Sequence, residues 1–152
     1  MTEKRVGIGE IRVEQGSSIL SAYGIGSCVV IILYDEEKKV GGLAHCLLPC
    51  GNEANLKCPR GAIAEVIKQM SKMGARLHRT VAKIIGGAMM FGYFEKYAIG
   101  KKNIAQARRE LQRLRIPVIA EDVFGNWGRS VIFKLENGEV EVKSFRHGNR
   151  II

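Results

Sequence analysis

The sequence lacks any long hydrophobic run. No stretch approaches the roughly 18 uncharged apolar residues that a membrane-spanning helix needs. Charges at Glu3, Glu10, Arg12 and Glu14 also interrupt the N-terminal segment, so the apolar core of a signal peptide is excluded there. We therefore expect a soluble, cytoplasmic protein that does not insert into membranes.

Acidic residues are scarce as well, since 15 Asp and Glu stand against 24 Lys and Arg and leave a formal net charge of +9. Such a surface attracts anions, which include nucleic acid, anionic membranes and acidic proteins. A hydrophobic fraction of 46% is too high for a disordered chain, and 152 residues are enough for one packed core. We expect a single domain over residues 1–152.

Cysteine is infrequent too, and its four positions are Cys28, Cys46, Cys50 and Cys58. Because nothing in the sequence indicates an oxidising compartment, we expect free thiols and not disulfides. A zinc site made by His45, Cys46, Cys50 and Cys58 is an alternative. These spacings contain no Cys-x-x-Cys pair, so we expect no metal.

Hydrophobic periodicity predicts both strands and helices. Alternating and β-branched runs predict strands at residues 6–13, 19–23, 28–34, 40–48, 80–85, 118–124, 130–135 and 140–145. Helical spacing predicts one helix over residues 57–74, with Pro59 near its start. A second helix is expected from about Asn103, which resembles a capping box with Gln106, to Arg115. This order predicts an α/β domain of the α+β type, a single domain of mostly antiparallel β-sheet layers with two main helices packed on it.

The third and fourth of these strands are expected to form a hairpin that brings a thiol and an imidazole together. A loop centred on residues 36–37 would pair Cys28 directly with His45, and a slightly shifted loop would place Cys46 there instead. Directly opposed residues have Cβ atoms roughly 4.5 to 5.5 Å apart. At that distance an imidazole takes the thiol proton and generates a nucleophilic thiolate, although a merely packed cysteine and histidine would have the same spacing.

Several short blocks of sequence surround this pair. Gly24-Ile-Gly26-Ser-Cys28-Val is followed, seventeen residues after its cysteine, by His45 within Gly-Leu-Ala-His-Cys-Leu-Leu-Pro. Further blocks lie at residues 7–10, 83–91, 99–103, 116–122 and 125–129. In these residues and in their order, the chain resembles the CheD family of chemoreceptor glutamine deamidases.

The resemblance implies a cysteine amidohydrolase that converts glutamines of chemoreceptor cytoplasmic helices to glutamates, releases ammonia and uses no cofactor. The family's cysteine nucleophile falls on Cys28 and its histidine on His45. Backbone N–H groups of the loop with Gly26 and Ser27 would serve as oxyanion donors, or the glycines there simply permit a tight turn. The implied core fold is similar to the deamidase domain of cytotoxic necrotizing factor toxins.

Two positions depart from the family pattern. The family usually has a catalytic Thr six residues before its cysteine, and Ala22 occupies that place here. The adjacent Ser21 is the candidate substitute, but neighbouring strand residues point to opposite faces, so it would need a bulge or bend near Gly24. The second departure is Phe124, where the family usually has Gly.

The resemblance also implies partners, which are the chemoreceptor cytoplasmic helices and a CheC-type phosphatase. A non-catalytic adaptor that binds these two partners is the alternative function. A basic run that includes Lys101, Lys102, Arg108 and Arg109 would also suit nucleic acid. Because no known nucleic-acid-binding signature accompanies it, we expect no nucleic acid.

Overall fold

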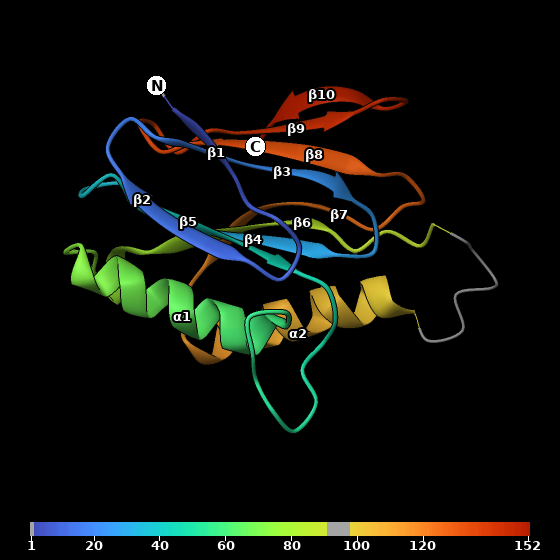
Figure 1. The fold of residues 1–152 in the computed structure, drawn as a ribbon, viewed down its shortest axis with the longest axis horizontal. Coiled ribbons are helices and arrows are strands. Elements are labelled where there is room, and N and C mark those ends of the chain that lie inside the picture. The colour runs from blue at the N-terminus through green and yellow to red at the C-terminus, as the bar shows by residue number, and fades with distance from the viewer. Residues whose placement is uncertain (1, 91–97) are drawn as a thin grey trace.

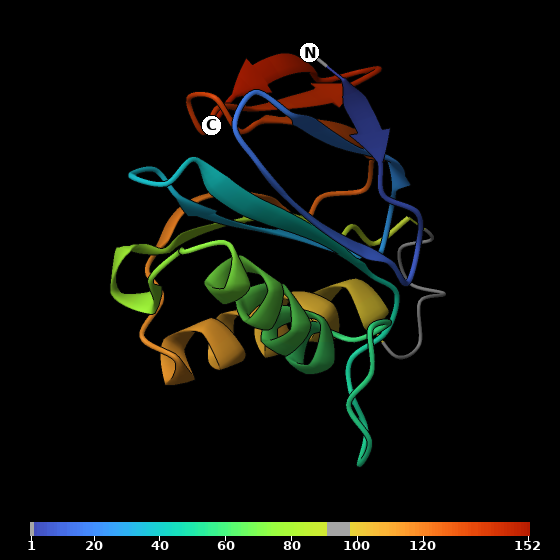
Figure 2. The ribbon, with the colours of Figure 1, turned by 60° about the vertical axis from the view of Figure 1, so that its left-hand side comes forward.

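Two five-stranded sheets and a layer of helices build the fold (Figure 1). The computed structural model describes residues 2–90 and 98–152, so Phe91, the last residue of one family block, lies outside the description. Sheet A has the strand order β1-β3-β8-β9-β10, and sheet B has the order β2-β5-β4-β6-β7. Figure 2 shows sheet B in the middle, with sheet A on one face and both helices on the other.

Most of the described strand pairs are antiparallel, as predicted. Parallel pairing joins β1 to β3 and β6 to β7. Their bounds are β1 Glu3–Arg5, β2 Ile11–Gln15, β3 Ile19–Ile25, β4 Val29–Asp35, β5 Val40–Cys46, β6 Val81–Gly86, β7 Val118–Val123, β8 Arg129–Lys134, β9 Val140–Ser144 and β10 Gly148–Ile151. The short edge strands β1 and β10 were not predicted. The strand expected at residues 6–13 begins only at Ile11, because a turn closed by the Glu10 amide and the Gly7 carbonyl precedes it.

The helices are α1 Pro59–Lys72 and α2 Ile99–Arg113, with a short 3-10 turn at Leu77–Arg79. The first agrees with the prediction, since Pro59 occupies the first turn, where its missing N–H is not needed. The second begins four residues before Asn103, so the predicted capping box is wrong. The side chain of Asn103 points to main-chain carbonyls outside the helix and caps nothing.

Two apolar cores hold the layers together. One lies between sheet B and the helices, and large residues in it include Ile31, Ile63 and Leu111. The other lies between the two sheets and includes Leu20, Phe133 and Cys28. β4 and β5 are buried along their whole length because sheet B is covered on both faces. Within the described residues, no helix has the length and the hydrophobicity needed to cross a membrane.

The prediction of four free thiols is wrong for one pair. Cys50 and Cys58 form a disulfide, whereas Cys28 and Cys46 are free and buried. Local chain reversal accounts for the pair, because the loop between β5 and α1 turns back on itself and leaves the two Cα atoms 5.0 Å apart. The Cys58 amide also bonds to the Asn55 carbonyl within this loop.

Candidate active site

Cys28 lies in the bend that joins β3 of sheet A to β4 of sheet B, and 6% of its surface is exposed. The chain that leaves β6 holds this bend by two main-chain hydrogen bonds, Gly87 N to Cys28 O at 2.8 Å and Ala88 N to Gly26 O at 3.0 Å. Gly86 is required for this approach, because it has a φ of 115° and an added Cβ would lie 2.3 Å from Cys28 O. The cysteine is therefore fixed by contacts that come from distant sequence.

His45 lies in β5 and is 1% exposed. Its Nδ1 is 3.2 Å from the carbonyl oxygen of Val6, so Nδ1 carries the proton and donates to that oxygen. In the neutral ring this leaves the lone pair on Nε2, which is buried and has no hydrogen-bond partner among the described residues. The ring is therefore held by one nitrogen while the other is available as a base.

The structure corrects the predicted register of the hairpin. His45 lies opposite Val30 and Cys46 lies opposite Val29, so Cys28 is one residue beyond the end of the ladder. Alternation along β4 places Cys28 on the same face as Val30, which makes Cys28 a diagonal neighbour of His45. Diagonal neighbours in an antiparallel pair are roughly 7 to 8 Å apart, a distance that an imidazole spans. The pair thus shares a face, but it is not directly opposed.

Asp35 explains the difference in register. The prediction assigned this charged residue to the loop, but it is fully buried as the last residue of β4, opposite Val40. Its carboxylate accepts hydrogen bonds from Arg79 Nε and from the Arg76 amide, and these partners lower its pKa although burial opposes them. Lys39 then closes a four-residue turn with a φ of 53°.

Burial controls the charge state of the pair. Removal from water raises the pKa of the Cys28 thiol and lowers the pKa of His45, although the Val6 carbonyl and Glu10 act in the opposite direction on the imidazole. Both shifts favour the neutral forms. Cys46 faces the other core, and burial raises its pKa to about 12, so it is poorly suited as a nucleophile.

Ser21 does not share the face of Cys28. Its hydroxyl donates to the Glu3 carboxylate at 3.0 Å, on the side of sheet A that faces away from sheet B. Ala22 has the opposite orientation and packs in the same inter-sheet core as Cys28. A bulge does follow, but it lies between Ala22 and Ile25 and leaves Ser21 in regular pairing with Ile132. A Thr hydroxyl at position 22 would therefore enter the core of the candidate site, and that of Ser21 does not.

Gly26 and Ser27 lie in the bend before Cys28, as expected for a loop that would supply oxyanion donors. The Ser27 carbonyl accepts a hydrogen bond from Asn103 Nδ2 at 2.9 Å, so the direction of the Ser27–Cys28 peptide is fixed. Sequence reasoning gave Asn103 only a helix-capping role. The position of Asn103 in the family block at residues 99–103 was the one sequence signal of a role beyond capping.

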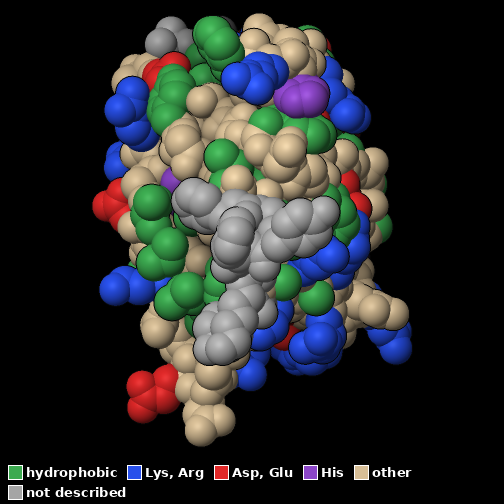
Figure 3. All heavy atoms as spheres, turned by 90° about the vertical axis from the view of Figure 1, so that its right-hand side faces the viewer, with side chains coloured by type: hydrophobic (Ala, Val, Ile, Leu, Met, Phe, Trp, Pro, Cys, Tyr) green, Lys and Arg blue, Asp and Glu red, His purple; other side chains and the backbone are tan. Residues whose placement is uncertain are grey.

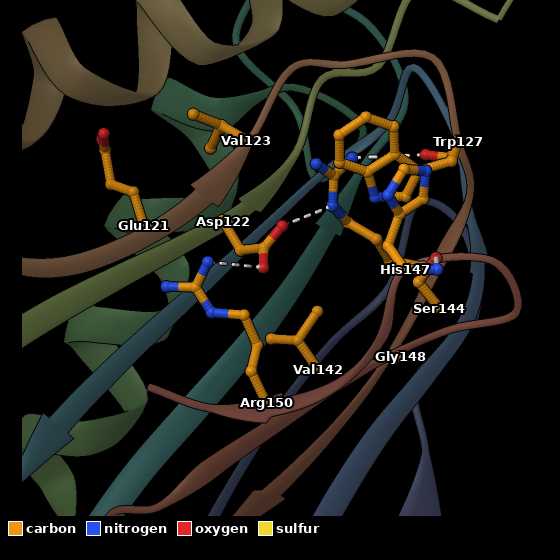
Figure 4. A pocket seen from close by; sticks show the side chains of 10 residues that line it. Glu121, Asp122, Val123, Trp127, Val142, Ser144, His147, Gly148 and Arg150 are labelled. Atoms are coloured by element: carbon orange, nitrogen blue, oxygen red, sulfur yellow. Dashed lines mark hydrogen bonds and ion pairs between the residues drawn. The ribbon is translucent and has the colours of Figure 1, made fainter.

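The family block at residues 125–129 lines a separate hollow of about 360 Å³ (Figure 4). Asp122 lies there between two arginines, at 2.7 Å from Arg129 Nε and 3.5 Å from Arg150 Nη1. The Trp127 ring stacks on His147 at 3.8 Å between centroids and covers the Arg129 guanidinium. This hollow is lined by neither member of the cysteine–histidine pair, and its charges already have partners within the chain.

Phe124, which precedes that block, has a φ of 70°. Only glycine adopts this left-handed conformation without strain, which accounts for the Gly that the family usually has here. The ring is held by the Arg108 guanidinium, 5.3 Å from its centroid, and its amide bonds to the Gly86 carbonyl. The departure thus strains the backbone locally but leaves the bend at Cys28 in place.

The end of the molecule that carries the bend has both apolar and basic side chains on its surface. Figure 3 shows hydrophobic and basic side chains gathered on this face. Exposed apolar residues of the neighbouring elements are Tyr23, Leu48 and Met90. Of the basic run in α2, Arg108 pairs with Glu121 at 2.6 Å, so part of that run is neutralised within the chain.

The zinc alternative is not assembled. Two of its four ligands, Cys50 and Cys58, are joined to each other in the disulfide. Within the part of the chain that the structure describes, no three side chains of the types that bind metals gather at one point.

Comparison with known proteins adds a family to this geometry. Residues 51–144 match the model of a family described as CheD chemotactic sensory transduction. A protein of Pyrococcus horikoshii named probable chemoreceptor glutamine deamidase CheD is 42% identical over 99% of this chain and 98% of its own length. A protein of Moorella thermoacetica with the same name is 40% identical over 99% of this chain and 95% of its own length. A protein of Geobacter metallireducens, named probable chemoreceptor glutamine deamidase CheD 2, is 41% identical over 93% of this chain and 93% of its own length.

Proposed function

This chain belongs to the CheD family, and from that premise we propose that it is a cytoplasmic chemoreceptor glutamine deamidase that acts as one domain, residues 1–152. Its substrate would be particular glutamines on the cytoplasmic helices of chemoreceptors, and its products glutamate side chains and ammonia. One structural observation supports the assignment of residues: His45 Nε2 has no hydrogen-bond partner among the described residues, and His45 lies on the sheet face that also carries Cys28.

The chemistry begins with a neutral pair. As the Cys28 sulfur attacks the carbon of the glutamine carboxamide, the thiol proton passes to His45 Nε2. The tetrahedral intermediate then collapses, the imidazolium gives this proton to the departing nitrogen, and ammonia leaves a thioester on Cys28. His45 next takes a proton from water, and the resulting hydroxide attacks the thioester. As this second intermediate collapses, the C–S bond breaks, the imidazolium returns its proton to the departing sulfur, and the new carboxylic acid ionises to glutamate.

The negative oxygen of the tetrahedral intermediate needs donors in the bend. The main-chain N–H of Cys28 lies near the attacking sulfur because both belong to one residue, and the N–H groups of Gly26 and Ser27 belong to the same bend. Such donors are worth far more in a water-excluded site than in water. No cofactor enters any of these steps, because the nucleophile, base and donors all belong to the chain.

The adaptor alternative has one observation in its favour, which is the apolar Ala22 in the place of the family's Thr. In that case the chain would bind receptor helices and a CheC-type phosphatase without turnover. The apolar and basic surface near the bend suits either function, since acidic receptor helices are attracted to positive charge. The retained base and nucleophile favour the enzyme.

The decisive experiment is mass spectrometry of a chemoreceptor cytoplasmic fragment after incubation with the protein, because each deamidation adds about one mass unit at a glutamine. We expect conversion by the parent and none by Cys28→Ala. The matched control is Cys46→Ala, which removes the other free thiol from the opposite face of the same sheet and should spare turnover. Undiminished conversion by Cys28→Ala would end the covalent mechanism.

A further inference from the structure

Asn103 lies in the second turn of α2, and none of its surface is exposed. Its side-chain nitrogen donates to two main-chain oxygens, Ser27 O at 2.9 Å and Leu47 O at 3.1 Å. The amide nitrogen has two hydrogens, so both are used. One side chain therefore ties two strand ends to the helix.

These two oxygens flank the candidate catalytic residues. Ser27 immediately precedes Cys28, and Leu47 follows His45 by two residues. Because the hairpin ladder ends at the pair Val29 and Cys46, no further pairing of β4 with β5 holds the segments beyond it. Asn103 thus connects the two chain ends at the place where the ladder stops.

The bond to Ser27 also sets the direction of a possible oxyanion donor. In a trans peptide the C=O and the following N–H point to opposite sides of the chain. Since the Ser27 carbonyl is held toward α2, the Cys28 N–H is directed away from α2. The same side chain that braces the bend therefore aims the N–H nearest to the nucleophile.

The side-chain oxygen of Asn103 takes no part in these two bonds. Its Oδ1 is buried and has no hydrogen-bond partner within the described residues. An acceptor buried in this way opposes folding. The hydrogen bonds described for this side chain therefore both go to the segments that flank Cys28 and His45.

We propose that Asn103 is a positioning residue for the deamidation reaction, one that fixes the Cys28 peptide and the end of the His45 strand relative to each other. The proposal rests on the deamidase function proposed above. It predicts that loss of the two donated bonds lowers kcat, because misplacement of a reacting group by about 1 Å is enough to lose roughly a hundred-fold in rate. KM should change little, since Asn103 is buried and does not reach the surface that a receptor would touch.

The test compares Asn103→Leu, which keeps the approximate volume and suits a helix, with Gln106→Leu one turn later. Gln106 is a matched control, because its amide also bonds to main-chain groups of the loop that follows β5, those of Cys50. We expect Asn103→Leu to lower kcat about 10- to 100-fold with little change in KM. Gln106→Leu should leave both constants within about two-fold. An equal loss in the two variants would overturn the proposal.

A second readout does not depend on deamidation. Alkylation of Cys28, followed by peptide mass spectrometry, should become several-fold faster in Asn103→Leu because the bend loosens. Cys46, which is free and fully buried in the core on the other face of sheet B, reports global opening and should keep its rate of alkylation. Equal acceleration of both thiols, or no change at Cys28, contradicts the proposal that Asn103 fixes the bend at Cys28. This holds even if the parent is not a deamidase.

A different outcome is that the parent shows no deamidation while alkylation of Cys28 alone becomes faster in the variant. That outcome would reject the proposed function, but it would support the role of Asn103 in fixing the bend. Asn103→Ala serves as the second variant, since it removes the same donors without adding apolar volume. If neither variant folds, Asn103 is a general folding determinant and the positioning role is refuted.

Discussion

The charge state of Cys28 before substrate binds gives the sharpest prediction. Burial raises the pKa of this thiol above its usual range, and burial lowers the pKa of the His45 imidazole. A raised thiol pKa reduces the thiolate population at neutral pH, and a lowered imidazole pKa reduces the imidazolium population. The two groups therefore rest as thiol and neutral imidazole, not as the ion pair found in many cysteine hydrolases.

Initial rates of alkylation of Cys28 by iodoacetamide, measured between pH 5 and 10, test this charge state. Because the thiolate is the reactive form, the rate should climb about ten-fold per pH unit through the neutral range and reach no plateau there. Cys46 is the internal control, since its pKa of about 12 and its full burial should keep it slow throughout.

An ion pair would give a different profile. If His45 held a proton and stabilised the thiolate, alkylation would reach a plateau with an apparent pKa below about 7. A plateau of that kind in the parent, lost in His45→Asn, would show that burial does not keep the pair neutral. It would also show that the diagonal pair closes into direct contact in solution.

Two further predictions concern the neighbours of Cys28. Replacement of the base by His45→Asn should lower deamidation by about 10² to 10⁴, and a loss of less than ten-fold in the receptor-fragment assay would remove His45 from the mechanism. Ala22→Thr should keep the fold, with a loss of stability of about 1 to 3 kcal/mol because position 22 is fully buried, and should raise turnover several-fold by adding a hydroxyl to the core of the site. Ser21→Ala is its control, because that hydroxyl bonds to Glu3 on the other face of the sheet, and a large loss of turnover in this variant would contradict the orientation that we describe.

Much of the local structure was determined by the sequence itself. The helix from Pro59 follows from a start signal and an apolar stripe, and both are properties of consecutive residues. The hairpin of β4 and β5 follows in the same way from two apolar runs around a polar turn. The family likewise follows from ordered blocks of residues, and the comparisons confirm it.

The geometry of the site comes from tertiary contacts that no local pattern reports. The register of the hairpin depended on Asp35, which stays in its strand because Arg79 pairs with it from a segment 44 residues away. The predicted helix start was wrong because the Asn103 side chain bonds to carbonyls of two distant segments and does not cap its own helix. Sequence patterns report the preferences of neighbouring residues, whereas these side chains are satisfied by partners that only folding brings near. The family could therefore be identified from the sequence. The positions of Cys28 and His45, and the contacts that fix them, could be described only from the folded structure.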